Sequence, residues 1–166
     1  MSNTTLTTLI RPLVPADRSR VEAMTRATTL FRPEEIPVAL DVFDAATGVG
    51  RRPDPDYETA GAEVDGVLVG WMVWGPTPCT LGTFDLYWIV VDVASQGHGI
   101  GGVLVEEMER RIGGRARLVV VETAGRPDYA PTRAFYAARG YQVAATIADY
   151  YAQGDDLVVF VKRIRD

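Results

Sequence analysis

A short glycine-rich segment, Gln96 to Gly102, contains the residues whose types and spacing most clearly indicate chemistry. It reads Gln-Gly-His-Gly-Ile-Gly-Gly, so four of its seven residues are glycines. Glycine allows a ligand to approach the backbone closely and permits dihedral angles that other residues avoid. The segment opens a predicted helix, whose first N–H groups have no partner within the helix and favour an anion. The sequence therefore predicts a backbone cradle for a pyrophosphate.

Two kinds of pyrophosphate ligand suit such a loop. Gly97, Gly99 and Gly102 fit the dinucleotide pattern Gly-x-Gly-x-x-Gly, and Glu122 lies about where that pattern places a ribose-binding acid. In the dinucleotide fold, however, the loop turns tightly out of its strand, whereas five residues separate Val91 from Gly97 here. Too few strand–helix units follow the loop to complete a nicotinamide site. A nicotinamide-dependent oxidoreductase is therefore the less favoured interpretation.

The segments before the loop predict a mainly antiparallel arrangement. Asp65-Gly66 between two apolar runs is a strong hairpin signal, and a further strand follows after a second short turn. Strands joined by short turns pair antiparallel. Pro33 suits the first turn of the second helix, although Pro37 offers an alternative start, and Gly48 follows its end. The predicted elements are a strand, two helices and three strands: 6–13, 17–28, 33–46, 57–64, 67–74 and 83–91.

The segments after the loop predict one parallel pair of strands. Residues 99–112 have apolar side chains at helical spacing, and the apolar run Leu118 to Val121 is typical of a strand buried on both faces. A strand, a crossover helix and a second strand should lie parallel. The remaining predicted elements are a helix and two strands: 128–139, 142–150 and 157–162. Together the pattern predicts a single α/β domain over residues 1–166, with a mixed, largely antiparallel sheet of about seven strands and helices on both faces.

Two segments carry a family resemblance. The first is Val91-x-x-x-x-Gln96-x-x-Gly99-x-Gly101, and the second is Thr-Arg-Ala-Phe-Tyr-Ala-Ala-Arg-Gly-Tyr at 132–141. They resemble the two signatures of the GNAT N-acetyltransferase superfamily, whose acetyl-CoA loop reads Gln/Arg-x-x-Gly-x-Gly/Ala. The order of elements agrees with that family from about residue 6 to 163. Two departures are Val93, where proline is common, and the absence from Pro131-Thr132-Arg133 of an asparagine that many members carry.

The resemblance implies how acetyl-CoA would be bound. In this family the strand before the loop splays apart from its parallel neighbour. In this sequence those two strands are the fourth and the fifth. Its backbone, here at Ile89, Val90 and Val91, pairs with the pantetheine arm like an added strand. Tyr136 would also contact the cosubstrate. The backbone N–H groups that would hold the pyrophosphate belong to Gln96, Gly97, His98, Gly99, Ile100, Gly101 and Gly102.

Direct acyl transfer to an amine needs a base, a donor to the thioester oxygen and an acid for the departing thiolate. The resemblance implies the Val91 N–H as the donor. Tyr136 aligns with the family's usual acid, and a phenol with a pKa of about 10 is protonated at neutral pH. Two carboxylates are candidates for the base. Asp85 lies six residues before Val91 on the same strand face, where some members carry a glutamate, and Glu122 lies near the end of the parallel strand. Tyr87 is a candidate proton relay.

Composition excludes several other classes of protein. Hydrophobic residues make up 47% and charged residues 23% of the chain, as in ordinary globular domains. The net charge of −5 argues against a nucleic-acid partner, which needs a basic face. One cysteine, Cys79, and one histidine, His98, exclude a disulfide framework and predict no metal site. The N-terminal residues lack a secretory pattern and no apolar run is long enough to span a membrane, so a cytoplasmic location is expected.

The favoured hypothesis is an acyltransferase that moves an acetyl group from acetyl-CoA to a primary amine of a small molecule, an amino acid or a peptide, by direct attack in a ternary complex. The alternative is an acyl-CoA-binding sensor module with little turnover, because the asparagine is absent and the base is undetermined. A homodimer is frequent among similar proteins and is an expectation here.

Overall fold

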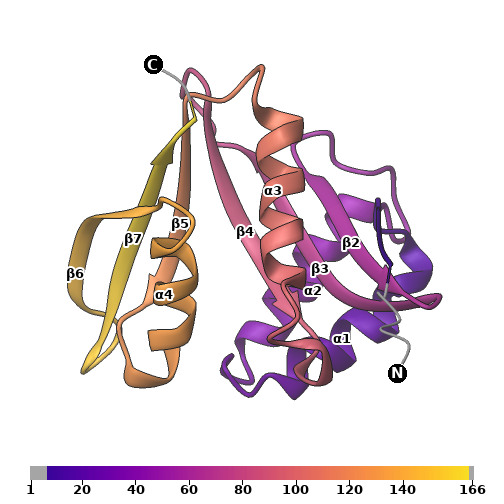
Figure 1. The fold of residues 1–166 in the computed structure, drawn as a ribbon, viewed down its shortest axis with the longest axis horizontal. Helices are drawn as coiled ribbons and strands as arrows, with labels where there is room; N and C mark the ends of the chain where they lie inside the picture. The colour runs from indigo at the N-terminus through magenta and orange to yellow at the C-terminus, as the bar shows by residue number, and fades with distance from the viewer. Residues whose placement is uncertain (1–6, 165–166) are drawn as a thin grey trace, which may run out of the picture. The chain divides into compact units, whose positions relative to one another are not determined.

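Seven strands and four α-helices make up residues 7–164, the part of the chain that the computed structural model describes (Figure 1). The strands are β1 (Thr8–Arg11), β2 (Glu58–Val64), β3 (Val67–Pro76), β4 (Thr83–Val91), β5 (Leu118–Ala124), β6 (Gln142–Ala152) and β7 (Asp155–Arg163). The α-helices are α1 (Arg18–Ala27), α2 (Glu35–Thr47), α3 (Ile100–Ile112) and α4 (Ala130–Ala137).

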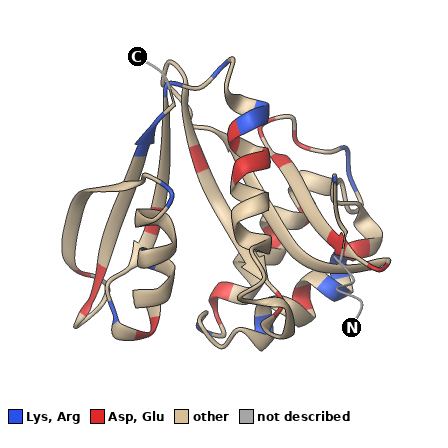
Figure 2. Ribbon diagram, viewed as in Figure 1, with Lys and Arg blue, Asp and Glu red and all other residues tan. Residues whose placement is uncertain are grey.

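The strands form one sheet in the order β1-β2-β3-β4-β5-β7-β6. The pair β4–β5 is parallel, and the pairs β1–β2, β2–β3, β5–β7 and β6–β7 are antiparallel. This arrangement confirms the predicted mixed, largely antiparallel sheet. Along the ribbon, acidic and basic residues are distributed over many elements (Figure 2). Within residues 7–164, no helix has the length and apolar character needed to cross a membrane.

Local sequence signals explain most of the element boundaries. Asp65 and Gly66 have φ angles of 50° and 78° and form the predicted two-residue turn between β2 and β3. Gly48, with φ 82°, ends α2 in the left-handed conformation. The predicted start of this helix at Pro33 is wrong by two residues, because α2 begins at Glu35. Pro37 then falls in the first turn, where its missing N–H removes no helical hydrogen bond.

Two other predicted boundaries need correction. The helix predicted over 128–139 is shorter, because a 3-10 turn at Pro127–Tyr129 precedes α4 and the helix ends at Ala137. The first strand, predicted over 6–13, ends at Arg11, and its predicted start at Leu6 lies outside the described residues.

The described residues form two compact units that are not contiguous in sequence. The first unit consists of residues 7–74 and 88–110, and the second of residues 75–87 and 111–164. One boundary between the units falls within β4, between Tyr87 and Trp88.

In the first unit, helices cover both faces of β3. A Cβ atom at Gly70 would lie 3.1 Å from Leu104 Cδ1 of α3. Trp71, the next residue, points the other way, where its ring lies 6.4 Å from that of Phe43 of α2 and its Nε1 donates to Thr25 Oγ1 of α1 at 3.2 Å. Successive side chains of a strand point to opposite faces. Helices α3 and α1–α2 therefore lie on opposite faces of the sheet, as predicted.

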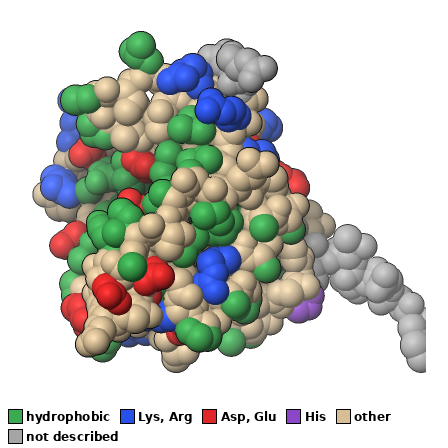
Figure 3. Space-filling view, turned by 90° about the vertical axis from the view of Figure 1, so that its left-hand side faces the viewer, with side chains coloured by type: hydrophobic (Ala, Val, Ile, Leu, Met, Phe, Trp, Pro, Cys, Tyr) green, Lys and Arg blue, Asp and Glu red, His purple; other side chains and the backbone are tan. Residues whose placement is uncertain are grey.

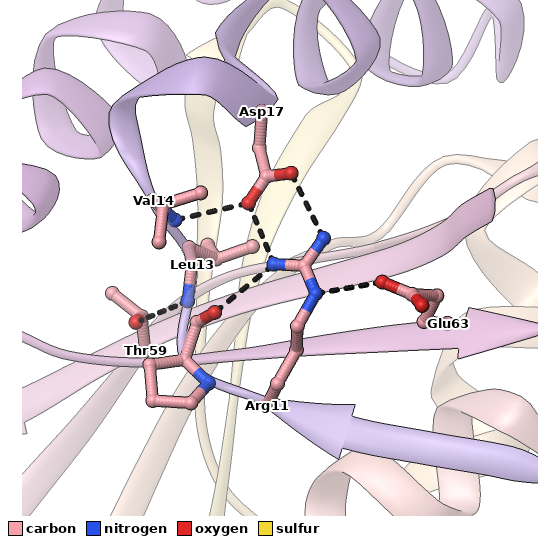
Figure 4. Close-up of polar contacts among 7 residues, drawn as sticks. Arg11, Leu13, Val14, Asp17, Thr59 and Glu63 are labelled. Carbon is pink, nitrogen blue, oxygen red and sulfur yellow. Dashed lines mark hydrogen bonds and ion pairs between the residues drawn. The ribbon is translucent and has the colours of Figure 1, made fainter. Parts of the chain in front are cut away.

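A network around Arg11 connects β1 to β2 and to the segment before α1 (Figure 4). The Arg11 guanidinium donates to both oxygens of Asp17 at 2.8 and 2.9 Å and to Glu63 Oε2 at 2.8 Å. The Val14 N–H donates to Asp17 Oδ2 at 2.9 Å. Partial burial opposes ionisation of Asp17, yet the hydrogen bonds from Arg11 and Val14 hold the pKa of this carboxyl below its usual value. The network fixes the chain direction at the start of α1.

In the second unit, β5 has one buried face rather than two. Val119 and Val121 are buried, whereas Leu118 and Val120 are half-buried and Glu122 is exposed. The prediction of burial on both faces is therefore wrong, although the strand itself and its parallel pairing with β4 are confirmed. The buried face meets α4, because Val121 pairs with Phe160 of β7, whose ring lies 5.9 Å from that of Tyr136.

Candidate active site

The glycine loop connects β4 to α3 in the first unit. The Val103 N–H donates to the Gly99 carbonyl at 3.1 Å, so the helical hydrogen bonds begin at Gly99. The N–H groups of the first turn, from Ile100 onward, precede this ladder and have no acceptor within the helix. Gly97 and Gly99 have φ angles of 78° and 81°, in the region that favours glycine.

The space beside the two glycines is open. A Cβ atom at Gly97 or Gly99 would meet no heavy atom within 4 Å. Backbone conformation, rather than crowding, therefore requires glycine at these positions. An open backbone surface at a helix N-terminus fits a pyrophosphate group, so these residues suit the phosphates of coenzyme A.

Hydrogen bonds within the first unit hold the loop to the end of β4. The Gln96 side-chain Nε2 donates to the Val91 carbonyl at 3.2 Å, which closes the turn between strand and loop. The Asp92 N–H donates to the Val69 carbonyl of β3 at 2.8 Å. His98 is exposed, and its Nδ1 lies 3.3 Å from the Ser95 carbonyl oxygen, so its ring contacts the loop itself. The glutamine of the loop signature thus has a structural role in this chain.

Arg20 of α1 also supports this connection, and sequence reasoning missed it. Its Nη2 lies 3.3 Å from Asp92 Oδ2, and its Nε donates to the Leu68 carbonyl at 2.9 Å. Asp92 directly follows β4, so this ion pair joins α1, β3 and the start of the loop. An isolated arginine on an amphipathic helix gives no sequence signal for such a distant partner.

The two candidate bases lie on one face of the second unit. Asp85 pairs in register with Val120, and Glu122 lies two residues further along β5, so both carboxylates share a sheet face. Asp85 is half-buried and its Oδ2 accepts a hydrogen bond from Thr77 Oγ1 at 2.7 Å. Glu122 is exposed. Thr77, in the turn after β3, is a partner that the sequence did not reveal.

Tyr136 lies on the other side of the same strands. Its ring contacts that of Phe160, which pairs with Val121 and so faces away from Asp85 and Glu122. Only 2% of Tyr136 is exposed, and the rings of Phe135 and Tyr141 lie 5.1 and 5.5 Å away. Burial raises the pKa of the Tyr136 phenol well above its usual value. The phenol therefore stays protonated at neutral pH, and it lies on the face of the strands opposite the carboxylates.

No group of three or more His, Cys, Asp or Glu side chains able to hold a metal ion occurs in residues 7–164. Cys79 is exposed in the turn between β3 and β4, at a φ angle of 62°. Ile89, Val90, Val91 and the loop belong to the first unit, whereas Asp85, Glu122 and Tyr136 belong to the second.

The sequence and the fold match known acetyltransferases. The family model described as Acetyltransferase (GNAT) domain matches residues 55–143. A GNAT-family protein from Desulfovibrio desulfuricans of known structure is 33% identical, with a TM-score of 0.86 over 95% of this chain and 99% of the other. The ribosomal-protein-S18-alanine N-acetyltransferase from Escherichia coli is 17% identical, with a TM-score of 0.78 over 96% of each chain. An aminoglycoside 6'-N-acetyltransferase complexed with coenzyme A is 15% identical, with a TM-score of 0.74 over 95% and 98%. No curated protein matches the sequence.

The sheet order, the parallel β4–β5 pair and the glycine loop before α3 define the class of GNAT-fold acetyltransferases. This chain belongs to the GNAT acetyltransferase family, because the family model covers more than half of it and the relative at 33% identity spans 95% of it. The two more distant structures show the shared fold. Family membership favours acetyl transfer over the dinucleotide interpretation of the loop.

Proposed function

We propose that this protein transfers an acetyl group from acetyl-CoA to a primary amine of a small molecule, an amino acid or a peptide. The observation that carries the proposal is the open backbone surface of Gly97 and Gly99 at the start of α3. The relative complexed with coenzyme A supports the choice of donor. The relatives named for an aminoglycoside and for a ribosomal-protein alanine support an amine as the acceptor.

In this proposal the first unit binds the donor. The N–H groups from Gln96 to Gly102 hold the pyrophosphate, and the backbone of Ile89, Val90 and Val91 pairs with the pantetheine arm at the splay between β4 and β5. The Val91 N–H donates to the thioester oxygen, where negative charge develops during attack. The hydrogen bond from Gln96 to the Val91 carbonyl supports this role, because it fixes the peptide groups at the end of β4.

Four side chains are candidates for the proton transfers. The amine must lose a proton before or during its attack, because an ammonium ion has no lone pair. Asp85 is the first candidate for the base, supported by its hydrogen bond with Thr77, and Glu122 on the same face is the second. Tyr87 remains a candidate relay. Tyr136 protonates the departing thiolate. The amine attacks a face of the planar thioester carbonyl, and the tetrahedral intermediate then collapses by breaking the C–S bond and expelling the thiolate.

A thiol-release assay tests this proposal. Purified protein is incubated with acetyl-CoA and a panel of primary amines, and free coenzyme A is measured along with the acetylated product. We expect amine-dependent release of the thiol. Tight binding of coenzyme A in calorimetry without transfer to any amine would instead indicate the sensor module. Binding of NAD but not of coenzyme A would indicate the oxidoreductase.

We also propose a cytoplasmic homodimer, in which the edge strand β6 contributes the contact. Val143, Ile147 and Tyr150 of this strand are 56%, 49% and 53% exposed. The space-filling view in Figure 3 shows hydrophobic side chains interspersed with polar and charged ones at the surface. Sedimentation equilibrium of the wild type and of Ile147→Lys tests the dimer: the wild type should sediment as a dimer and the variant as a monomer. A monomeric wild type would refute it.

A further inference from the structure

A row of aromatic rings in the first unit runs from the core to the segment between α1 and α2. Phe43 meets Trp71 edge-on, with ring centroids 6.4 Å apart, and Trp71 stacks on Trp88 at 6.4 Å with 16° between the ring planes. Phe31 meets Trp88 edge-on at 5.1 Å. Phe43 and Trp71 are fully buried, whereas Trp88 and Phe31 are half-buried. The outer end of the row is therefore partly accessible.

The inner end of the row is held in place. Trp71 Nε1 donates to Thr25 Oγ1 at 3.2 Å, and Thr25 Oγ1 donates to the Val21 carbonyl at 2.7 Å. All three residues are buried. Because Trp71 is fixed, the Trp88 ring stacked on it has a defined orientation.

The segment that carries Phe31 has a strained backbone. Thr29 has a φ angle of 56°, although β-branched residues strongly disfavour the left-handed region. Hydrogen bonds fix the chain on both sides: the Leu30 N–H donates to Thr28 Oγ1 at 3.4 Å, and the Arg32 N–H donates to Glu35 Oε2 at 2.6 Å. A strained backbone conformation persists only where the surrounding structure holds it in place, and such conformations cluster at functional sites. Here it turns the chain so that Phe31 reaches Trp88.

The position of Trp88 connects this pair to the proposed reaction. Trp88 directly precedes Ile89, Val90 and Val91, the backbone assigned above to the donor's acyl end. Through Trp88, the Phe31–Trp88 pair therefore lies next in the chain to the backbone assigned to the donor, where it can contact an acceptor.

We infer that Phe31 and Trp88 form an acceptor subsite, selecting amines joined through a short linker to an aromatic or flat apolar group. The inference rests on the proposed function. The aromatic group of the acceptor would contact the rings of Trp88 and Phe31, and these contacts would cause the preference for aromatic amines. The amine itself lies at the other end of the linker.

The test compares two amines of the same basic type, 2-phenylethylamine and ethylamine. The wild type should acetylate 2-phenylethylamine with a kcat/KM about tenfold or more above that for ethylamine, in line with the strength of aromatic contacts. In Phe31→Ala this ratio should fall about tenfold, because the ring contact with the phenyl group is lost. Phe31→Tyr should retain the ratio. Leu81→Ala, which truncates an 86% exposed apolar side chain in the second unit, should not change it.

Further measurements separate the ways in which the inference can fail. Phe31→Leu keeps an apolar side chain of similar size without a ring, and it replaces Phe31→Ala if that variant does not fold. Calorimetric binding of coenzyme A shows whether the donor site of each variant is intact. An unchanged ratio in a folded Phe31→Ala or Phe31→Leu, or the absence of a preference in the wild type, would overturn the subsite. If the wild type acetylates no amine at all, the proposed function fails first.

Discussion

Three side chains of the second unit, Tyr136, Asp85 and Glu122, are the proposed groups for proton transfer. Tyr136 is enclosed by three other aromatic rings, and burial raises its pKa, so that its phenol stays neutral throughout the physiological pH range. Asp85 and Glu122 lie on the opposite face of the strands, in more exposed surroundings. The phenol and the two carboxylates therefore lie on different faces of the strands, and their proposed roles can be tested one residue at a time.

Replacement of Tyr136 by Phe should lower kcat by about 100-fold, because general acid catalysis typically contributes that much. The ring contacts remain, so the melting temperature and the affinity for coenzyme A should change little. Tyr141→Phe is the matched control, since Tyr141 is also buried and its ring contacts that of Tyr136. Equal turnover in the wild type and Tyr136→Phe would remove this residue from the mechanism.

The identity of the base can be decided by comparing Asp85→Asn with Glu122→Gln. We expect Asp85→Asn to lower kcat/KM by about 100-fold and to change its pH profile, whereas Glu122→Gln should change both by much less. Thr77→Val removes the hydrogen bond to Asp85 and should have an intermediate effect. The reverse order of the two carboxylate variants would assign the base to Glu122.

At the scale of elements, the connection between β4 and α3 depends on contacts from other elements. Arg20 on α1 binds Asp92 and the Leu68 carbonyl, and the Asp92 N–H is bound by β3. These contacts set the position from which the loop leaves the sheet. They also explain why a residue far from the loop in sequence should affect binding of the donor.

Arg20→Ala should weaken the binding of coenzyme A by about threefold to tenfold, because one charge-assisted contact that positions the loop is lost. Arg26→Ala is a control on the same helix, where Arg26 pairs with Glu22 at the surface. Calorimetry with coenzyme A measures both variants. Equal affinities for coenzyme A in the two variants would exclude a positioning role for Arg20.

The Arg11 network should make stability depend on pH at the acid side. The pKa of Asp17 lies below its usual value, so its contribution is present above the unfolded pKa of about 3.9 and is lost as pH falls through the folded pKa. Asp17→Asn should therefore reduce the free energy of unfolding by about 1–3 kcal/mol at pH 7 and by less below pH 4. Glu22→Gln, which alters a surface pair, should cost under about 1 kcal/mol. Denaturant unfolding at several pH values measures both, and a deficit for Asp17→Asn that stays constant with pH would contradict the assignment.

Much of this fold follows from local sequence signals, and the remainder depends on distant contacts. The Asp65-Gly66 turn, the end of α2 at Gly48 and strand β4 could be predicted because turn chemistry and periodicity are local. The burial of β5 could not, because an apolar run does not reveal which face a helix will cover. The place of β7 between β5 and β6, and the Arg20–Asp92 ion pair, likewise depend on residues brought together only by folding.

The candidate site was predictable to a similar degree. The glycine loop has a sequence signature, and the structure gives Gly97 and Gly99 the backbone angles that the signature implies. The partner of Asp85 and the aromatic pair of Phe31 and Trp88 have no signature. Phe31 lies in an irregular segment, where hydrophobic periodicity provides no information about contacts.

At the scale of the whole molecule, the predicted single domain can be tested through its two units. Each unit contains segments from separate parts of the chain, and both β4 and α3 contribute residues to both units. Such interleaving favours one cooperative unfolding transition. All three tryptophans, Trp71, Trp74 and Trp88, belong to the first unit, so tryptophan fluorescence reports on that unit alone.

Far-UV circular dichroism reports on both units, and we expect its thermal midpoint to coincide with that of tryptophan fluorescence. A fluorescence transition displaced by more than the fitting error would indicate two separately unfolding domains instead.

The hydrogen bonds that hold the glycine loop to β4 have a kinetic consequence. A loop already fixed by Gln96 and Asp92 needs little reorganisation when its ligand arrives, so the encounter itself should limit the association rate. The protein carries a net charge of −5 and the phosphates of coenzyme A are anionic, so their long-range interaction is repulsive. Added salt screens that repulsion. Capture of the donor should therefore become faster as ionic strength rises, the opposite of electrostatically steered association.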